Sequence, residues 1–325
     1  MASSIDLSGL GKYTDQLSQA LVRESVLGGE TFKYITVIPN IKYSDALNKI
    51  TSSFNAVAGG CGIIAPTGSV AVQQNNLTVC PIKIEESICE NDIEQYWLGM
   101  FMAAGSYTED LSPKEFAQVY TADKQAKLQA YMDDLFWKAS PSNHYSSDPN
   151  LALCTGLLET LDYTAATYST VSGNGTFSTN TTMTVGNAIA ICDSMIAAMN
   201  TSASQILTEN DLTLFMSYAD FNTLTVALRN ANYFHYSVGQ EETGAARWTF
   251  MYPGHNIRVV AVRGLNGTNK RLLTNGKNLA MGTDLQSDYS KFRIWYENLY
   301  DTVYFRAKFK IGANAYYYQN IVYFK

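Results

Sequence analysis

The sequence lacks the patterns that identify most enzymes and metalloproteins. Its three histidines, His144, His235 and His255, stand in no HExxH or comparable spacing of metal ligands. No G-x-S-x-G nucleophile elbow occurs, and the cysteines have no flanking signature of a catalytic thiol. Residues 9–12 (GLGK) lack the earlier glycine and the Ser or Thr of a phosphate-binding loop, and residues 173–175 lack the third glycine of a dinucleotide fingerprint. We therefore expect no catalytic residue, no metal site and no cofactor.

Long apolar runs are also missing. No stretch of about 18 apolar residues could span a bilayer, and residues 1–19 have neither the basic nor the apolar part of a secretory signal. Charged residues make up 16% and hydrophobic residues 46% of the 325, a composition that excludes a disordered chain. We expect an ordered cytosolic product that divides into two or more lobes.

Cysteine is scarce, and its count is odd. The five residues are too scattered for a metal knuckle, and in a reducing compartment they are most simply small core residues. We therefore expect free thiols at all five positions: Cys61, Cys80, Cys89, Cys154 and Cys192.

The net charge of −6 conceals a segregation of charge along the chain. Acidic residues dominate between residues 85 and 162, whereas Lys and Arg dominate between residues 258 and 325. A basic segment could bind nucleic acid, but an acidic segment in the same chain suits self-complementary packing better. The alternative is two solvated surfaces of opposite sign.

The first half of the chain suggests an arm, a hairpin and a long helix. Residues 1–45 read as an extended arm with a short helix, and glycines punctuate a two-stranded excursion over residues 46–84. Ser112, Pro113 and Glu115 form a capping box with proline at the first helical position. An apolar stripe then predicts a helix to about Ala139, stopped by Pro141.

The second half suggests a separate α/β lobe. After a loop region at 140–183, with one short helix candidate at 151–161, an apolar stripe predicts a helix on Val185, Ile189, Cys192, Ile196 and Met199. Further predicted elements are a strand at 212–218, a helix around 221–228 capped by residue 217 or 220, and strands at 248–252, 257–262 and 279–281.

The tail is rich in aromatic residues and alternates with a period of two. Apolar Val303, Phe305, Ala307 and Phe309 alternate with Tyr304, Arg306, Lys308 and Lys310, which predicts a half-buried strand. Residues 311–314 suggest a turn, and residues 315–324 suggest a second strand that runs back along the first. So many aromatic rings are not expected to remain open to water.

The order of these parts resembles the major capsid proteins of tailed double-stranded DNA bacteriophages (Caudoviricetes) over essentially the whole chain. Residues 278–324 resemble the end of the family, and TVCPIKIEESICENDIEQYW (residues 78–97) resembles the return from its extended loop into its spine helix. The cysteines that flank the excursion, Cys61 with Cys80 and Cys89, look like those of crAss-like or other Bacteroidetes-infecting phages.

The resemblance implies an α+β tailed-phage/herpesvirus major-capsid fold. Its parts would be an N-arm at 1–45, an extended loop at 46–84, a peripheral domain with a spine helix at 85–183 and 291–325, and an axial domain at 184–290. It implies a structural protein of the virion, not an enzyme, that assembles in the host cytoplasm into hexamers and pentamers of an icosahedral head. The implied partners are copies of itself, a separate scaffolding protein, a portal and a decoration protein, around DNA that is enclosed without being read and with no membrane.

In such shells a neighbour's extended loop covers the peripheral strands, so the resemblance also implies contact residues between subunits. The candidates are Ile63, Ile64, Val70, Val72, Tyr304, Arg306, Lys308, Tyr316, Tyr317 and Tyr318. Alternatively, the tyrosines cap the core of their own subunit. The loop holds only Lys49 and Lys83, near its ends, so the lysine–asparagine cross-link of some relatives is not expected. The runner-up function is another virion structural or binding protein, such as a tail tube or adhesin, and an unrecognised enzyme comes third.

Overall fold

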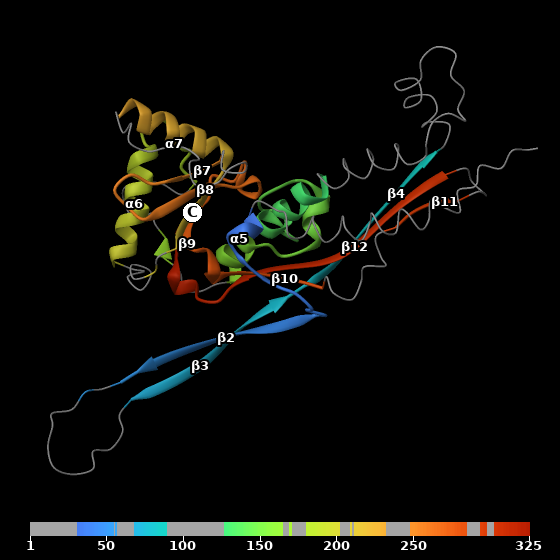
Figure 1. Cartoon of the computed structure of the whole chain (residues 1–325), viewed down its shortest axis with the longest axis horizontal. Coiled ribbons are helices and arrows are strands. Elements are labelled where there is room, and N and C mark those ends of the chain that lie inside the picture. Colours follow the sequence, from blue (N-terminus) through green and yellow to red (C-terminus); the bar gives the residue numbers. More distant parts are fainter. Residues whose placement is uncertain are drawn as a thin grey trace, which may run out of the picture.

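The computed structural model describes residues 31–54, 56, 68–89, 127–164, 169–170, 180–201, 209, 211–231, 248–284, 293–297 and 302–325. They form a hairpin and two larger sheets (Figure 1). The hairpin extends away from the rest of the molecule. Of the two larger sheets, one is long and passes beside a rounded lobe, and the other lies within that lobe (Figure 1).

The long sheet is built around one strand, β12 (Thr302–Ala315). On one edge β12 pairs antiparallel with β4 (Cys80–Cys89) over ten residues. On the other edge it pairs with β11 (Arg293–Glu297) and then with β10 (Leu279–Thr283). The short strand β1 (Thr36–Ile38) lies parallel to β10.

The predicted alternation along the tail is confirmed, but the predicted turn is wrong. Phe305, Ala307 and Ile311 are buried, and Phe309 packs edge-on against Tyr131 at 6.5 Å between ring centroids. The strand then continues through residues 311–314 because these pair with β10. Gly312 permits this path, since a Cβ atom there would overlap the carbonyl oxygen of Thr78.

The last strand, β13 (Ile321–Phe324), joins the sheet of the lobe and does not pair with β12. The expected tail strand pair is therefore wrong. All four β13 residues are buried. This is typical of an interior strand with both faces covered, and not of a strand with one face in contact with solvent. A 3-10 turn, η11 (Tyr318–Asn320), connects the two strands.

The lobe sheet has the order β5-β13-β9-β6-β8-β7. Its other strands are β5 (Ser169–Thr170), β6 (Leu212–Met216), β7 (Thr249–Met251), β8 (Ile257–Ala261) and β9 (Arg271–Asn275). Helices α6 (Ala188–Thr201) and α7 (Tyr218–Asn230) pack on one face (Figure 1). The helical residues 127–138 and α5 (Leu157–Glu159), which continues into η5 (Thr160–Thr164), pack on the other. The sheet thus separates two hydrophobic cores.

Local sequence signals explain most of these elements. Ser217 accepts a hydrogen bond from Asp220 N at 3.0 Å and caps α7, one of the two caps that the sequence suggests. Of the predicted stripe, Cys192, Ile196 and Met199 are buried in α6 and Ile189 is half-buried, whereas Val185 precedes the helix and is 43% exposed. The predicted helix at 151–161 is instead split between η4 (Pro149–Leu153) and α5. Further 3-10 turns are η1 (Thr31–Lys33), η8 (Arg263–Leu265) and η9 (Gly276–Asn278).

The capping box at residues 112–115 lies outside the described residues, but residues 127–138 are helical and end before Pro141, as predicted.

The expectation of free thiols is wrong for Cys80 and Cys154, which form a disulfide with Cα atoms 5.9 Å apart. Cys192 is free and buried, as expected, and burial raises the pKa of its thiol to about 12.

Candidate interaction surface

In the part of the chain that the structure describes, the hairpin of β2 (Ser44–Ser53) and β3 (Ser69–Thr78) is highly exposed. Ten residue pairs hold the two strands in antiparallel register. Leu47 and Leu77 are buried near the root, whereas almost every residue toward the tip is exposed. Figure 1 shows the strands reaching away from the lobe. A two-stranded ribbon of this kind has too little core to be stable without other contacts.

One face of the hairpin is apolar and open to solvent. Ile50 lies opposite Val72, and Val70 lies two residues further along on the same face. These side chains are 65%, 64% and 70% exposed, and Phe54, just after β2, is 89% exposed. A cluster of exposed apolar side chains on a two-stranded ribbon is typical of a surface that another chain covers.

The root of the hairpin is fixed to the long sheet. Asn75 Nδ2 donates to the carbonyl oxygens of Ala315 (2.9 Å) and Tyr316 (2.8 Å). In return, Asn314 Nδ2 donates to Asn76 O at 2.7 Å. A small core of Ile41, Leu47, Leu77, Val79 and Ala280 fills the junction. The hairpin therefore projects from a defined base.

A buried carboxylate also clamps this base. The Asp284 side chain is 1% exposed and binds Lys42 Nζ and Lys310 Nζ, each at 2.9 Å. Lys310 Nζ additionally donates to Lys42 O at 2.8 Å. Since Lys42 precedes β2 and Lys310 lies on β12, the clamp joins the start of the hairpin to the centre of the long sheet.

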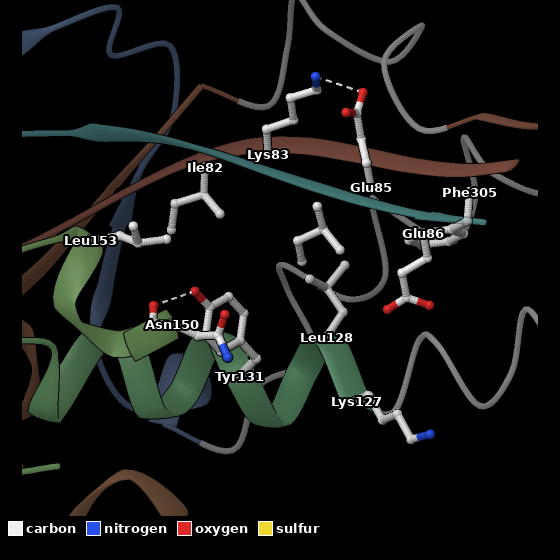
Figure 2. Close-up of a pocket in the computed structure, with 11 residues that line it drawn as sticks. Ile82, Lys83, Glu85, Glu86, Lys127, Leu128, Tyr131, Asn150, Leu153 and Phe305 are labelled. Atoms are coloured by element: carbon white, nitrogen blue, oxygen red, sulfur yellow. Dashed lines mark hydrogen bonds and ion pairs between the residues drawn. The ribbon is translucent and has the colours of Figure 1, made fainter. Parts of the chain in front are cut away.

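A second feature is a groove of about 410 Å³ between β4 and the helical residues 127–138. Figure 2 shows the helix on one side and β4 with Phe305 on the other. Apolar walls come from Ile82, Ile84, Leu128, Leu153 and Phe305, and the polar lining residues are Lys83, Glu85, Glu86, Lys127, Tyr131 and Asn150.

Two polar residues of the groove, Tyr131 and Glu85, bind partners within the same chain. Tyr131 Oη donates to Asn150 O at 2.7 Å, and burial, with a smaller effect of Asp148, raises the pKa of this phenol to about 12. The phenol therefore stays protonated at neutral pH and uses its hydrogen in the bond to Asn150 O. Glu85, at the rim, binds Lys83 (2.6 Å) and Arg306 (2.5 Å), and the hydrogen bond from Lys83 is the main cause that lowers its pKa.

The segregated charges meet partly within one chain. Among the described residues, four bases of the tail region have partners in the acidic segment of the same chain: Arg263 with Asp134, Arg306 with Glu85, and Lys270 and Lys325 with Asp162. The sequence predicted complementarity between these segments, and at these pairs the subunit uses it internally. Exposed Lys308 lies on the same face of β12 as Arg306.

The structure places the predicted contact residues in three groups. Val70 and Val72 lie on the apolar hairpin face, and Tyr304, Arg306 and Lys308 lie on the face of β12 turned away from the helix. The three tyrosines 316–318 lie at the β12–η11 connection and are half-buried. Tyr316 packs on the hairpin-root core and Tyr318 on the large core, so both help to cover their own subunit. Ile63 and Ile64 lie outside the described residues.

Sequence reasoning missed Ile50 and Phe54. Their signal was present, because Ile50 is an apolar residue in an otherwise polar stretch of β2 and falls opposite Val72 once the hairpin register is known. It also missed Asp284, whose clamping role depends on two lysines far away in the sequence.

Two further observations concern other classes of site. Within the described ranges, no group of three His, Cys, Asp or Glu side chains is arranged to hold a metal ion. No helix in that part of the chain is long and apolar enough to cross a membrane.

Comparison with known proteins gives a fold but no close relative. The sequence matches no protein-family profile and no curated protein. Among solved structures, a chain of the satellite phage P4 procapsid has a TM-score of 0.58 at 15% identity and covers 95% of this chain and 90% of its own. A chain of Gordonia phage Cozz has a TM-score of 0.53 at 13% identity, with coverage of 91% and 85%. A virus-like particle from Pyrococcus furiosus has a TM-score of 0.51 at 12% identity, with coverage of 96% and 99%.

These similarities extend over nearly the whole length of each chain. The protein therefore has the α+β fold of tailed-phage capsid proteins and related particles, as the sequence predicted.

Proposed function

We propose that this chain is the major capsid protein of a tailed phage, a structural subunit and not an enzyme, which closes into an icosahedral head around double-stranded DNA. The observation that carries the proposal is the β2–β3 hairpin, whose root is fixed and whose apolar face is exposed. A surface that exposes Ile50, Val70 and Val72 together is typical of a site that another chain covers.

The covering chain is a second copy of the subunit. In this arrangement the apolar hairpin face of one copy lies against the long sheet of its neighbour. The predicted contacts Tyr304, Arg306, Lys308 and the tyrosines 316–318 lie on or beside β12, where a neighbouring loop would reach them. Such contacts, shared among several neighbours in hexamers and pentamers, would bury an area on the order of thousands of Å² per subunit.

The division of the chain follows from this proposal. Residues 1–45 would be the arm, 46–84 the extended loop, 85–183 with 291–325 the peripheral domain, and 184–290 the axial domain. β13 pairs with β9, so residues 321–324, which belong to the proposed peripheral domain, share a sheet with a strand of the proposed axial domain.

Other partners follow from the same arrangement. A separate scaffolding protein, a portal and a decoration protein would join the shell, which would assemble in the host cytoplasm and end in the virion. DNA would be enclosed without sequence recognition, because a chain of net charge −6 does not favour tight phosphate binding. The proposal of a host among the Bacteroidetes rests on Cys61, Cys80 and Cys89, of which Cys80 is bonded to Cys154.

The test places charges on the apolar hairpin face. Val70→Asp with Val72→Asp should leave the subunit folded, because both residues are exposed and the root core is untouched. Purified variant and wild type would be compared by negative-stain microscopy and circular dichroism. Wild type should form closed particles tens of nanometres wide, and the variant should remain as unassembled subunits with an unchanged spectrum.

The matched control carries the same charges on the opposite face of β3. Ala71→Asp with Gln73→Asp changes residues that alternate with the valines and are equally exposed. This control should assemble. Closed particles from the valine variant would overturn the proposed contact. Rings or trimers from the wild type would instead support the runner-up, a tail tube or an adhesin.

A further inference from the structure

The disulfide lies at the point where the hairpin meets the rest of the subunit. Cys80 is the first residue of β4, directly after Val79 of the hairpin-root core, and it lies opposite Ile311 on β12. Cys154 follows η4, is 5% exposed and belongs to the large core. The bond joins residues 74 positions apart in the sequence.

Both ends of the bond are firmly attached to neighbouring structure. On the hairpin side, Val79 N donates to Tyr43 O at 2.9 Å. On the other side, Ser140 N donates to Leu151 O (2.9 Å) and Gly156 N donates to Ala139 O (2.8 Å), which ties the segment around Cys154 to the end of the 127–138 helix. The disulfide therefore connects the hairpin root to the end of the 127–138 helix, which packs on one face of the long sheet.

The subunit can hold this geometry without the bond. Cys154 is part of the apolar core and Cys80 packs against it, so two thiols would occupy the site as small apolar side chains. Ten backbone-paired positions between β4 and β12 also keep Cys80 in place. Folding and assembly thus do not require oxidation.

The bond conflicts with the compartment in which a phage subunit is made. Disulfides do not persist in a reducing cytosol, whereas a particle released from the cell meets an oxidising medium. We propose, resting on the capsid function above, that Cys80 and Cys154 are thiols during folding and assembly and form the disulfide only in the released particle. The late bond then fixes the hairpin root of each subunit after the shell has closed.

The chemistry needs a small oxidant such as oxidised glutathione or another low-molecular-weight disulfide. Cys80, the more exposed of the two, loses its proton to solvent and attacks one sulfur of the oxidant, releasing one reduced thiol. Cys154 then loses its proton and displaces the second thiol from Cys80. In total, two protein thiols are oxidised by two electrons, and one small disulfide is reduced to two thiols.

The experiment follows the bond through time in wild-type particles. Producing cells are lysed into N-ethylmaleimide, and particles released into the medium are treated in the same way without reductant. Peptide mass mapping should find Cys80 and Cys154 alkylated in cells and joined in released particles. Dithiothreitol should lower the unfolding temperature of released particles by about 5 °C.

Two variants make the test specific. Cys80→Ser with Cys154→Ser should assemble in normal yield, since the thiols are not needed for assembly, and should lose the shift with dithiothreitol. Cys61→Ser, the matched control, should keep both the linked peptide and the shift.

Three results would overturn the inference: a linked peptide already present in cells, thiols still free in released particles, or a double variant that folds but does not assemble. If wild-type subunits form no particles under any condition, the proposed function itself fails. That result is distinct from particles that form and keep both thiols.

Discussion

At the residue scale, buried charged groups are fixed by specific partners and thereby position whole segments. Asp133, on the 127–138 helix, accepts hydrogen bonds from Thr31 Oγ1 and from Gly264 N (3.1 Å), and burial raises the pKa of this carboxyl. Trp137 Nε1 donates to the same Thr31 hydroxyl at 2.9 Å. One side chain thus joins the start of the described chain, a helix and the loop after β8.

The buried pair of Arg271 and Asp220 gives a sharp prediction. Arg271 is fully buried, donates Nε to Asp220 Oδ2 at 2.8 Å, and lies over the Phe324 ring at 5.0 Å. Asp220→Ala would leave a buried guanidinium without its counter-ion and should lower the free energy of unfolding by about 3–5 kcal/mol. Urea unfolding followed by tryptophan fluorescence measures this loss.

A double variant separates the pair from its surroundings. Asp220→Leu with Arg271→Met removes both charges and should recover most of the stability lost in the single variant, because no unpaired charge remains. If Asp220→Ala alone unfolds at the same urea concentration as the wild type, the ion pair does not stabilise the lobe.

At the element scale, the hairpin is divided between structure and contact. Its root belongs to the core through Leu47 and Leu77, and it is bound to the long sheet through the side-chain amide of Asn75 and the carbonyl oxygen of Asn76. The distal part, residues 50–54 and 68–72, has exposed side chains wherever it is described.

The corresponding prediction removes only the distal part. Lys49 and Gln73 are paired opposite each other, so an Asn-Gly turn can replace residues 50–72 without changing the register of the root. The shortened subunit should be monomeric, with unchanged helical circular dichroism and a free energy of unfolding within about 1 kcal/mol of the wild type. Microscopy should find no shells.

Either of two results would contradict this division of the hairpin. Normal particles would mean that the distal strands are not contact elements. Loss of the helical signal would mean that residues 50–72 support the fold of their own subunit.

The sequence predicted elements with a strong local signal and missed those that depend on distant partners. The stripe of α6, the Ser217 cap and the alternation in β12 were readable because each is set by neighbours within a few residues. β9 was missed because its first residue is a buried arginine, which is acceptable only with Asp220 beside it. The path of the tail was wrong at residues 311–324 because pairing with β10 and β9, not local preference, decides it.

The same contrast holds for the contact surface. Val70 and Val72 were named as candidates because the resemblance places them on an extended loop, and both are exposed in the structure. Their arrangement with Ile50 follows only from a register that the chain does not reveal. The disulfide was missed because its two cysteines are 74 residues apart and meet only in the folded core.

At the scale of the whole molecule, several bases of the tail pair with acidic residues of the same chain. The described bases of the tail that pair within the chain include Arg306 and Lys310, whereas Lys308 is exposed beside Arg306 on β12. If acidic and basic surfaces of neighbouring copies also guide their encounter, assembly must depend on ionic strength.

We expect assembly to slow when salt is raised from about 0.05 to about 0.5 M, because the Debye length falls to below about 5 Å. Light scattering after mixing gives the rate, and an uncharged osmolyte at matched osmolality is the control. An unchanged rate would mean that charge does not guide the encounter of the copies and that the apolar hairpin contact drives assembly.

β13 is synthesised after all the other strands of the lobe sheet. Residues 321–324 lie inside the lobe sheet, between β5 and β9, and Ile321, Val322, Tyr323 and Phe324 complete the two cores that the sheet separates. A ribosome that has finished β6, α7, β8 and β9 has therefore made most of the lobe but not the strand that closes it. Prematurely terminated chains remain open along one edge of β9, so the order of synthesis itself keeps unfinished subunits from acquiring the finished surface of the lobe.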